Sequence, residues 1–174
     1  MKYLYLTSLF LLAIAGCSAN NQNAVADNQT IESDTQITTF QNDFFKVDIP
    51  SNWEIFSSEG PHMPSHVSLV RKDGSALITL GVARSSRTIE DTCNLVANNL
   101  VNDSKNLLEK PEVQFGTCIV QAKENGIHKE MWMRSYEDKS LYSIYFEGEL
   151  SIVDEILSSL QGNEEMMSLL VRPI

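Results

Sequence analysis

The sequence lacks the short motifs that mark many enzymes and nucleotide-binding proteins. It contains no Gly-x-Gly-x-x-Gly sequence and no phosphate-binding loop. The pairs Ser57-Ser58 and Ser85-Ser86 stand outside any Gly-x-Ser-x-Gly sequence, the strained turn that exposes the serine nucleophile of many hydrolases. We therefore predict a protein that is not an enzyme, with no catalytic residues and no cofactor.

Positive charge is also in short supply. Lys and Arg number 13 against 23 Asp and Glu, which gives a formal net charge of −10. An acidic chain repels nucleic acid, and its net charge does not favour binding to anionic lipid. The charge would instead speed the approach of a cationic protein. The alternative is that the charge serves solubility alone.

The apolar run that opens the chain is too short to span a membrane. It covers Leu4 to Ala15 and is interrupted by Thr7 and Ser8, whereas a transmembrane helix needs about 20 apolar residues. Lys2 gives it a positive start, and small residues follow it. This arrangement is typical of a signal peptide that is removed after secretion.

The end of this run resembles the lipobox of bacterial lipoproteins, on the residues Ile14-Ala15-Gly16-Cys17. The resemblance implies that residues 1–16 are a lipoprotein signal peptide and that Cys17 is lipidated, which anchors the chain to a membrane. In enterobacterial lipoproteins an Asp after the cysteine favours the inner membrane. Ser18 stands there in this chain, so we expect an outer-membrane lipoprotein that faces the periplasm. An ordinary signal peptide with a chance cysteine is the alternative.

Cysteine is scarce, and lipidation of Cys17 would leave only Cys93 and Cys118. Disulfides persist in oxidising compartments such as the periplasm. We predict that these two cysteines form a disulfide, with two buried free thiols as the alternative. Neither cysteine stands in a sequence context typical of a catalytic thiol.

Composition divides the chain into a tether, a domain and a tail. Residues 17–39 are rich in Asn, Gln, Ser, Thr and Asp and have few large apolar side chains, so they cannot bury enough surface to offset the entropy of ordering. We predict a flexible tether there, a folded domain over residues 40–161 and a C-terminal tail over residues 162–174. The tail either packs on the domain or offers an apolar patch to a partner.

Alternation of apolar and polar residues predicts strands, and Asp73-Gly74 and Asn125-Gly126 predict tight hairpins. Residues 57–65 contain Gly60, Pro61 and Pro64 and are predicted to form a loop. The predicted strands cover residues 44–49, 66–72, 76–84, 113–122, 127–136 and 141–148.

Two helices are predicted. The first begins at Thr88, whose following acidic residues resemble a capping box, and ends at Pro111. Its apolar stripe comprises Ile89, Cys93, Val96, Leu100, Leu107 and Leu108. The second lies within residues 151–160. Because helices and strands are segregated along the chain, we predict an α+β fold in which helices flank an antiparallel sheet of about six strands.

The order of these elements, with FKVDIPSNWEI at residues 45–55, resembles the PsbP-like superfamily, which includes DcrB-type bacterial envelope lipoproteins. The long helix, the three-stranded meander and the closing ILSSL at residues 156–160 extend the resemblance over residues 40–161. The resemblance implies a PsbP-like sandwich that acts as a binding or assembly module. Some periplasmic lipoproteins of similar architecture are immunity proteins that block cell-wall-cutting effectors delivered by type VI secretion.

We therefore predict a non-enzymatic, lipid-anchored periplasmic protein-binding module. Its sharpest form is an immunity protein that neutralises a secreted cell-wall-degrading effector, and this partner would be a cationic hydrolase. The alternatives are an assembly or accessory factor of an envelope complex and a small-molecule carrier. The candidate partner-binding residues are predicted to lie in exposed loops; they are Glu59, His62, His66, Glu137 and Asp138.

Two of the histidines, His62 and His66, stand four apart near Glu59. That spacing would favour a metal site on a helix, but Pro61 and Pro64 make a helix unfavourable there. We predict exposed loop histidines and no metal site.

Overall fold

The computed structural model describes residues 37–100 and 106–171, which belong to one folded unit, Asp34–Ile174. The predicted signal peptide, Cys17 and all but the end of the tether lie outside the described residues. The strands are β1 (Thr38–Gln41), β2 (Phe45–Ile49), β3 (Trp53–Glu59), β4 (Ser65–Arg71), β5 (Leu77–Arg84), β6 (Glu112–Gln114), β7 (Thr117–Glu124), β8 (Ile127–Ser135), β9 (Ser140–Glu147) and β10 (Gln161–Gly162). The helices are α1 (Ile89–Leu100), α2 (Leu150–Leu157), α3 (Glu164–Met167) and the 3-10 helix η2 (Ser168–Leu170).

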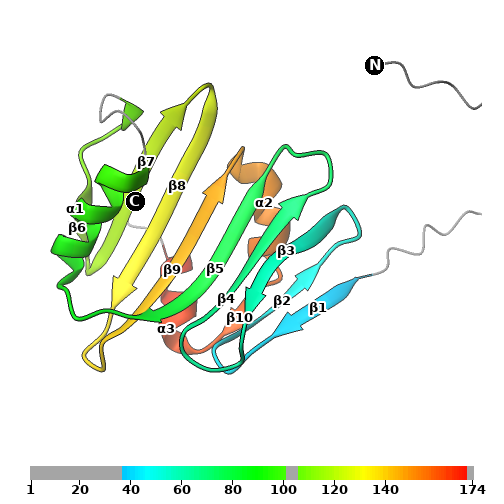
Figure 1. Ribbon diagram of the computed structural model, residues 1–174, viewed down its shortest axis with the longest axis horizontal. Coiled ribbons are helices and arrows are strands. Elements are labelled where there is room, and N and C mark those ends of the chain that lie inside the picture. The colour runs from blue at the N-terminus through cyan, green and yellow to red at the C-terminus, as the bar shows by residue number, and fades with distance from the viewer. Residues whose placement is uncertain (1–36, 101–105, 172–174) are drawn as a thin grey trace, which may run out of the picture. The chain divides into compact units, whose positions relative to one another are not determined.

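Within these ranges the strands form two antiparallel sheets (Figure 1). The larger sheet has seven strands in the order β3-β4-β5-β9-β8-β7-β6, and the smaller has three in the order β1-β2-β10. The predicted α+β fold with an antiparallel sheet is therefore confirmed. In the described residues the structure adds β1, β3 and β10 to the predicted strands. It also divides the predicted strand at residues 113–122 into β6 and β7 and places β2 in a second sheet.

The main core lies between one face of the larger sheet and the smaller sheet, α2 and α3. Side chains on a strand point alternately to opposite faces, so every second residue of β2, β4, β5 and β9 points into this core. Its members include Phe45, Val47, Ile49, Val67, Leu69, Ile78, Leu80, Val82, Ile144, Phe146, Val153 and Ile156. The strands predicted over residues 44–49, 66–72, 76–84 and 141–148 therefore all contribute to this core.

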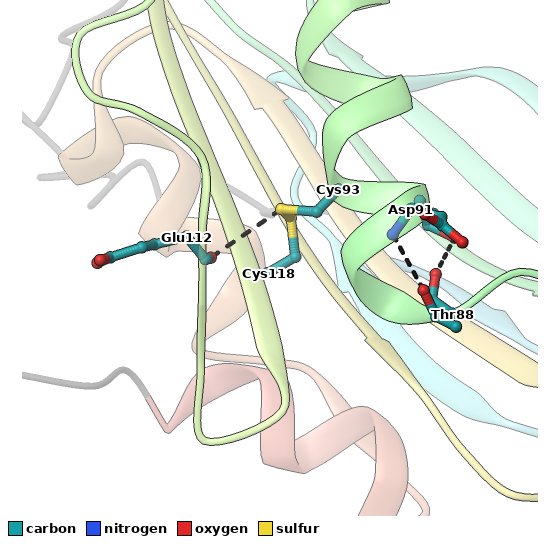
Figure 2. Close-up of a disulfide and its surroundings, with 6 residues drawn as sticks. Thr88, Asp91, Cys93, Glu112 and Cys118 are labelled. Carbon is teal, nitrogen blue, oxygen red and sulfur yellow. Dashed lines mark hydrogen bonds between the residues drawn. A yellow bond between two sulfur atoms is a disulfide. The ribbon is translucent and has the colours of Figure 1, made fainter.

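A second, smaller core lies on the other face of the larger sheet, between α1, β7 and β8. The backbone N–H of Asp91 donates to Oγ1 of Thr88 at 3.1 Å, so Thr88 caps α1 as predicted (Figure 2). One turn further on, Cys93 forms a disulfide with Cys118 of β7, with Cα atoms 5.7 Å apart (Figure 2). The predicted pairing is confirmed, and it fastens α1 to the sheet.

The prediction that the first helix continues to Pro111 is wrong beyond residue 105. Residues 101–105 lie outside the described residues, and after them Leu107 forms a β-bridge with Ala122 of β7. The side chain of Leu108 is 50% exposed rather than part of a buried stripe. Two factors oppose a longer helix. Asn98 and Asn99 at the end of α1 are weak helix formers, and pairing with β7 gives the backbone at Leu107 a partner outside a helix.

The predicted loop over residues 57–65 is shorter in the structure. Ser57, Ser58 and Glu59 belong to β3, where they pair with Ser68, Val67 and His66 of β4. Cross-strand pairing therefore overrides the weak strand propensity of the serines. The connection that remains is residues 60–64.

The tail packs on the domain. Asn163 caps α3 by accepting a hydrogen bond from the backbone N–H of Met166 at 3.1 Å. Met166 and Leu169 are buried in the main core. At the other end, β1 begins at Thr38, two residues before the predicted start of the domain.

Candidate functional site

Strand register brings the two predicted binding segments to one end of the larger sheet. Ser65 at the start of β4 lies opposite Val82 of β5, and Arg84 of β5 lies opposite Ser140 at the start of β9. The loop before β4 and the turn before β9 therefore lie about two strand spacings apart, roughly 10 Å. We call this surface, formed by residues 42–44, 60–64, 115–116 and 136–139, the loop end.

The N-terminal segment enters the domain away from the loop end. The first residue of β1, Thr38, lies opposite Ile49, whereas its last residue, Gln41, lies opposite Lys46, next to the turn at residues 42–44. β1 therefore runs toward the loop end (Figure 1).

His62 lies in the loop at residues 60–64, as predicted. Its Nδ1 atom is 2.6 Å from Oδ2 of Asp43, and the backbone N–H of Asp43 donates to the carbonyl of Pro61 at 3.2 Å. The His62 side chain is 82% exposed. An ion pair this exposed adds little to stability, so the imidazole is free to meet a partner.

Glu59 and His66 are strand residues rather than the loop residues that we predicted. They lie opposite each other in β3 and β4, with Oε2 of Glu59 3.8 Å from Nδ1 of His66. His66 also lies opposite Gly81 of β5. Both side chains therefore stand on the open face of the sheet, close to the loop end but not within its loops.

Glu137 and Asp138 lie in the turn between β8 and β9, as predicted, and their roles differ. Oδ1 of Asp138 accepts hydrogen bonds from the backbone N–H and the hydroxyl of Ser140, at 2.9 and 2.5 Å. These bonds, and secondarily the charge of Arg84, lower the pKa of Asp138. Asp138 therefore stabilises the turn, and the exposed Glu137 is the carboxylate more available to a partner.

The loop end is not uniformly acidic. Arg84 and Lys139 lie beside Asp138, and the guanidinium of Arg134 stands 5.7 Å from the ring centroid of Tyr136. Sequence charge alone did not reveal this mixture, because the strands that bring Arg84 and Arg134 here are far apart in the chain.

The sequence analysis missed Phe115, the most exposed large apolar side chain described, at 88%. It forms the β6–β7 turn with Gly116, and both residues have positive φ, 49° and 78°. Left-handed backbone is costly for a residue with a bulky side chain. Gly116 is the one signal that could have predicted this turn, because a glycine inside a predicted strand often marks a bend.

Two negative findings concern the described residues, 37–100 and 106–171. No three His, Cys, Asp or Glu side chains in these ranges gather as ligands for a metal ion. No helix in them has the length and apolar character needed to cross a membrane.

Comparisons with known proteins bear on the fold. No family model matches the chain, and no curated protein matches it in sequence. The chain is similar to the solution structure of PsbP (CyanoP) from Synechocystis sp. PCC 6803, with 13% identity, a TM-score of 0.45 and coverage of 80% of this chain and 98% of that one. These figures describe a distant likeness and carry no functional argument.

A second similar structure is a crystal structure of a protein from Bacteroides thetaiotaomicron VPI-5482, with 12% identity and a TM-score of 0.41. The match covers 75% of this chain and 49% of that one, so this chain spans about half the length of the Bacteroides protein.

Proposed function

We propose that the protein is a lipid-anchored, non-enzymatic binding module of the bacterial envelope that meets a protein partner with its loop end. The observation that supports this most is the register of the larger sheet, which gathers His62 and Glu137 at one end. In the smaller sheet, β1 runs toward that same end. Anchored through Cys17 in the outer membrane, the domain would offer the loop end to the periplasm.

The size and chemistry of the loop end suit a protein partner. From β4 to β7 the sheet is four strand spacings wide, about 20 Å, so the loop end extends across several strands. Phe115 at one side is an exposed aromatic held on a short turn, the kind of residue that dominates binding energy once a partner buries it. His62 and Glu137 add polar contacts.

The sharpest form of this proposal is an immunity protein of the DcrB-type envelope lipoproteins, which would occlude the groove of a secreted cell-wall-degrading effector. The net charge of −10 would speed its encounter with a cationic hydrolase. An accessory factor of a resident envelope complex would use the same surface, so the identity of the partner separates these two forms.

The test begins with the lipidated full-length protein in mild detergent as bait for proteins of the native envelope. A secreted hydrolase bound in equal amount supports the inhibitor form, and a resident envelope protein supports the accessory form. Absence of any stoichiometric protein partner would contradict the proposal. Replacing Cys17 by Ala should move the protein from the membrane to the soluble fraction, which tests the anchor separately.

The surface is tested by association kinetics with the captured partner. Glu137→Lys should slow association several-fold at low salt, and Phe115→Ala should speed dissociation. Glu149→Lys is the matched control, because Glu149 is equally exposed and lies beyond the opposite end of β9. Equal effects of Glu137→Lys and Glu149→Lys would show that the loop end is not the binding surface.

A further inference from the structure

The open face of the larger sheet carries a groove beside α1. On this face α1 packs over β7 and β8, and in the part of the chain that the structure describes no helix lies over β3, β4 and β5 (Figure 1). The groove has a volume of about 350 Å³, within the range of small-molecule sites. Val96, Asn99 and Leu100 of α1 form its wall, and Thr79, Ser143 and Tyr145 form its floor.

The floor of the groove carries two small hydroxyl side chains, Thr79 and Ser143, beside the larger Tyr145. Thr79 lies between Ser68 and Tyr145 in the register, and the hydroxyls of Ser68 and Thr79 are 2.8 Å apart. Their hydrogen bond satisfies both hydroxyls in part, so the floor presents little unpaired polarity to a ligand.

Gly81 extends the floor toward His66. It lies between His66 and Ser143, and a Cβ atom built on it would stand 3.3 Å from Oγ of Ser143 and 3.5 Å from Cβ of His66. A glycine in the interior of a strand often marks a place where another group approaches the backbone. A side chain at this position would crowd Ser143, so the glycine lets the Ser143 hydroxyl lie close to the backbone.

The opposite end of the groove is acidic. The Tyr145 hydroxyl donates a hydrogen bond to Oε1 of Glu147. Nζ of Lys129 lies 3.0 Å from Oε2 of Glu124 and 4.0 Å from Oε1 of Glu147. Lys129 therefore contacts both carboxylates, and the Glu147 side chain is 34% exposed against 17% for Lys129. The outward group at this end is the carboxylate.

We infer that this groove binds a small apolar molecule that carries a positive charge, such as an amine on an apolar body. The apolar body packs against Val96, Leu100 and Met131, and the ammonium lies beside Glu147. A carboxylate ligand of the same shape is disfavoured, because it would place like charges together in a partly buried site. This site is separate from the loop end and goes beyond the proposed protein-binding function.

The binding test uses two probes with the same apolar body and opposite charge, 4-phenylbutylamine and 4-phenylbutyrate. The lipidated full-length protein is held in nanodiscs, empty nanodiscs are the blank, and calorimetry with saturation-transfer NMR measures binding. The amine should bind at least tenfold more tightly than the carboxylate. Equal binding of both probes, or binding of neither, would overturn the inference.

Two neighbouring residues of α1 supply a matched pair of variants. Asn99 lines the groove, whereas Asn98 is exposed and does not line it. Asn99→Trp should fill the groove and weaken amine binding at least tenfold, while Asn98→Trp should leave it unchanged. Equal loss in both variants would place the probe elsewhere, and circular dichroism checks that both remain folded.

The charge preference is tested at Glu147. Glu147→Gln keeps the length and shape of the side chain and removes its charge, so the tenfold preference for the amine should shrink to about twofold or less. A preference that survives intact would show that Glu147 does not select the ligand. Binding of the protein partner should be insensitive to Asn99→Trp, so failure of this inference is distinguishable from failure of the proposed function.

Discussion

The indole Nε1 of Trp53 donates a hydrogen bond to Oε2 of Glu155 at 3.1 Å, between residues 102 positions apart in the chain. Trp53 begins β3 and its side chain is buried, while Glu155 lies on the exposed side of α2. The same carboxylate accepts a hydrogen bond from Nδ2 of Asn52 at 3.2 Å. This contact fastens the turn between β2 and β3 to α2.

Replacing Glu155 by Ala should therefore destabilise the domain. The substitution leaves the Trp53 N–H without its acceptor, which costs about 1 kcal/mol because water reaches the rim of the contact. The midpoint of urea denaturation should fall with no change in slope.

Two variants check this interpretation. Glu155→Gln retains an acceptor oxygen and should lose less stability than Glu155→Ala. Asp154→Ala removes an adjacent exposed carboxylate of α2 and should change the midpoint little. If Asp154→Ala costs as much as Glu155→Ala, general charge on α2 rather than the Trp53 contact is responsible.

The Cys93–Cys118 disulfide should contribute a large part of the stability. It joins residues 25 positions apart, and closing a loop of this length in the unfolded chain is worth about 3 kcal/mol in the chain-entropy model. The double substitution of Cys93 and Cys118 by Ala should lower the free energy of unfolding by about that amount. Urea denaturation of the oxidised protein and the variant measures the difference.

A reductant supplies the control for the disulfide. It should destabilise the native protein and leave the double variant unchanged. Native protein that keeps its midpoint after verified reduction would contradict the prediction. The disulfide holds α1 against the sheet, and α1 forms the wall of the groove. The double Cys93 and Cys118 to Ala variant should therefore also bind 4-phenylbutylamine more weakly.

Tyr145 should make stability fall at alkaline pH. Burial raises the pKa of its phenol above the ordinary value of 10.0, and the hydrogen bond to Glu147 raises it further. The unfolded chain releases this proton at about pH 10 while the folded chain keeps it, so the contribution is complete below pH 10 and is lost as pH rises above it.

Comparison with Tyr145→Phe isolates this effect. Between pH 8 and 11 the native protein should lose more stability than the variant, since both share every other titrating group. Parallel losses would contradict the prediction. Burial also raises the pKa of Tyr142, so tyrosinate absorbance at 295 nm should show that the phenols of both Tyr142 and Tyr145 ionise above pH 10 in the folded protein.

Much of the fold could be predicted because strong local patterns agree with the tertiary structure. Phe45, Val47 and Ile49 alternate in the chain and all lie in the main core. The turn at Asp73-Gly74 joins β4 to β5, with Gly74 at φ 73°. The helix prediction failed at Leu107. Its apolar side chain fits the spacing of the predicted helical stripe, but its backbone pairs with Ala122 of β7.

The candidate site was only partly predictable. His62 and Glu137 could be predicted as exposed loop residues. Gly60, Pro61 and Pro64 mark a loop around His62, and a run of charged residues marks the turn at Glu137. The groove beside α1 has no such signal, since Thr79, Asn99 and Ser143 are individually unremarkable and come from three separate elements. Phe115 was missed because an aromatic side chain is usually taken to point inward.

The sequence by itself determined the periodicities and the hairpin turns at Asp73-Gly74 and Asn125-Gly126, because these depend on neighbours within a few residues. Tertiary structure alone decided which turns share an end of the sheet and which face α1 leaves open. Register and strand order set those relationships, and they depend on hydrogen bonds between distant segments. Glu137 and His62 share the loop end because β5 pairs with both β4 and β9.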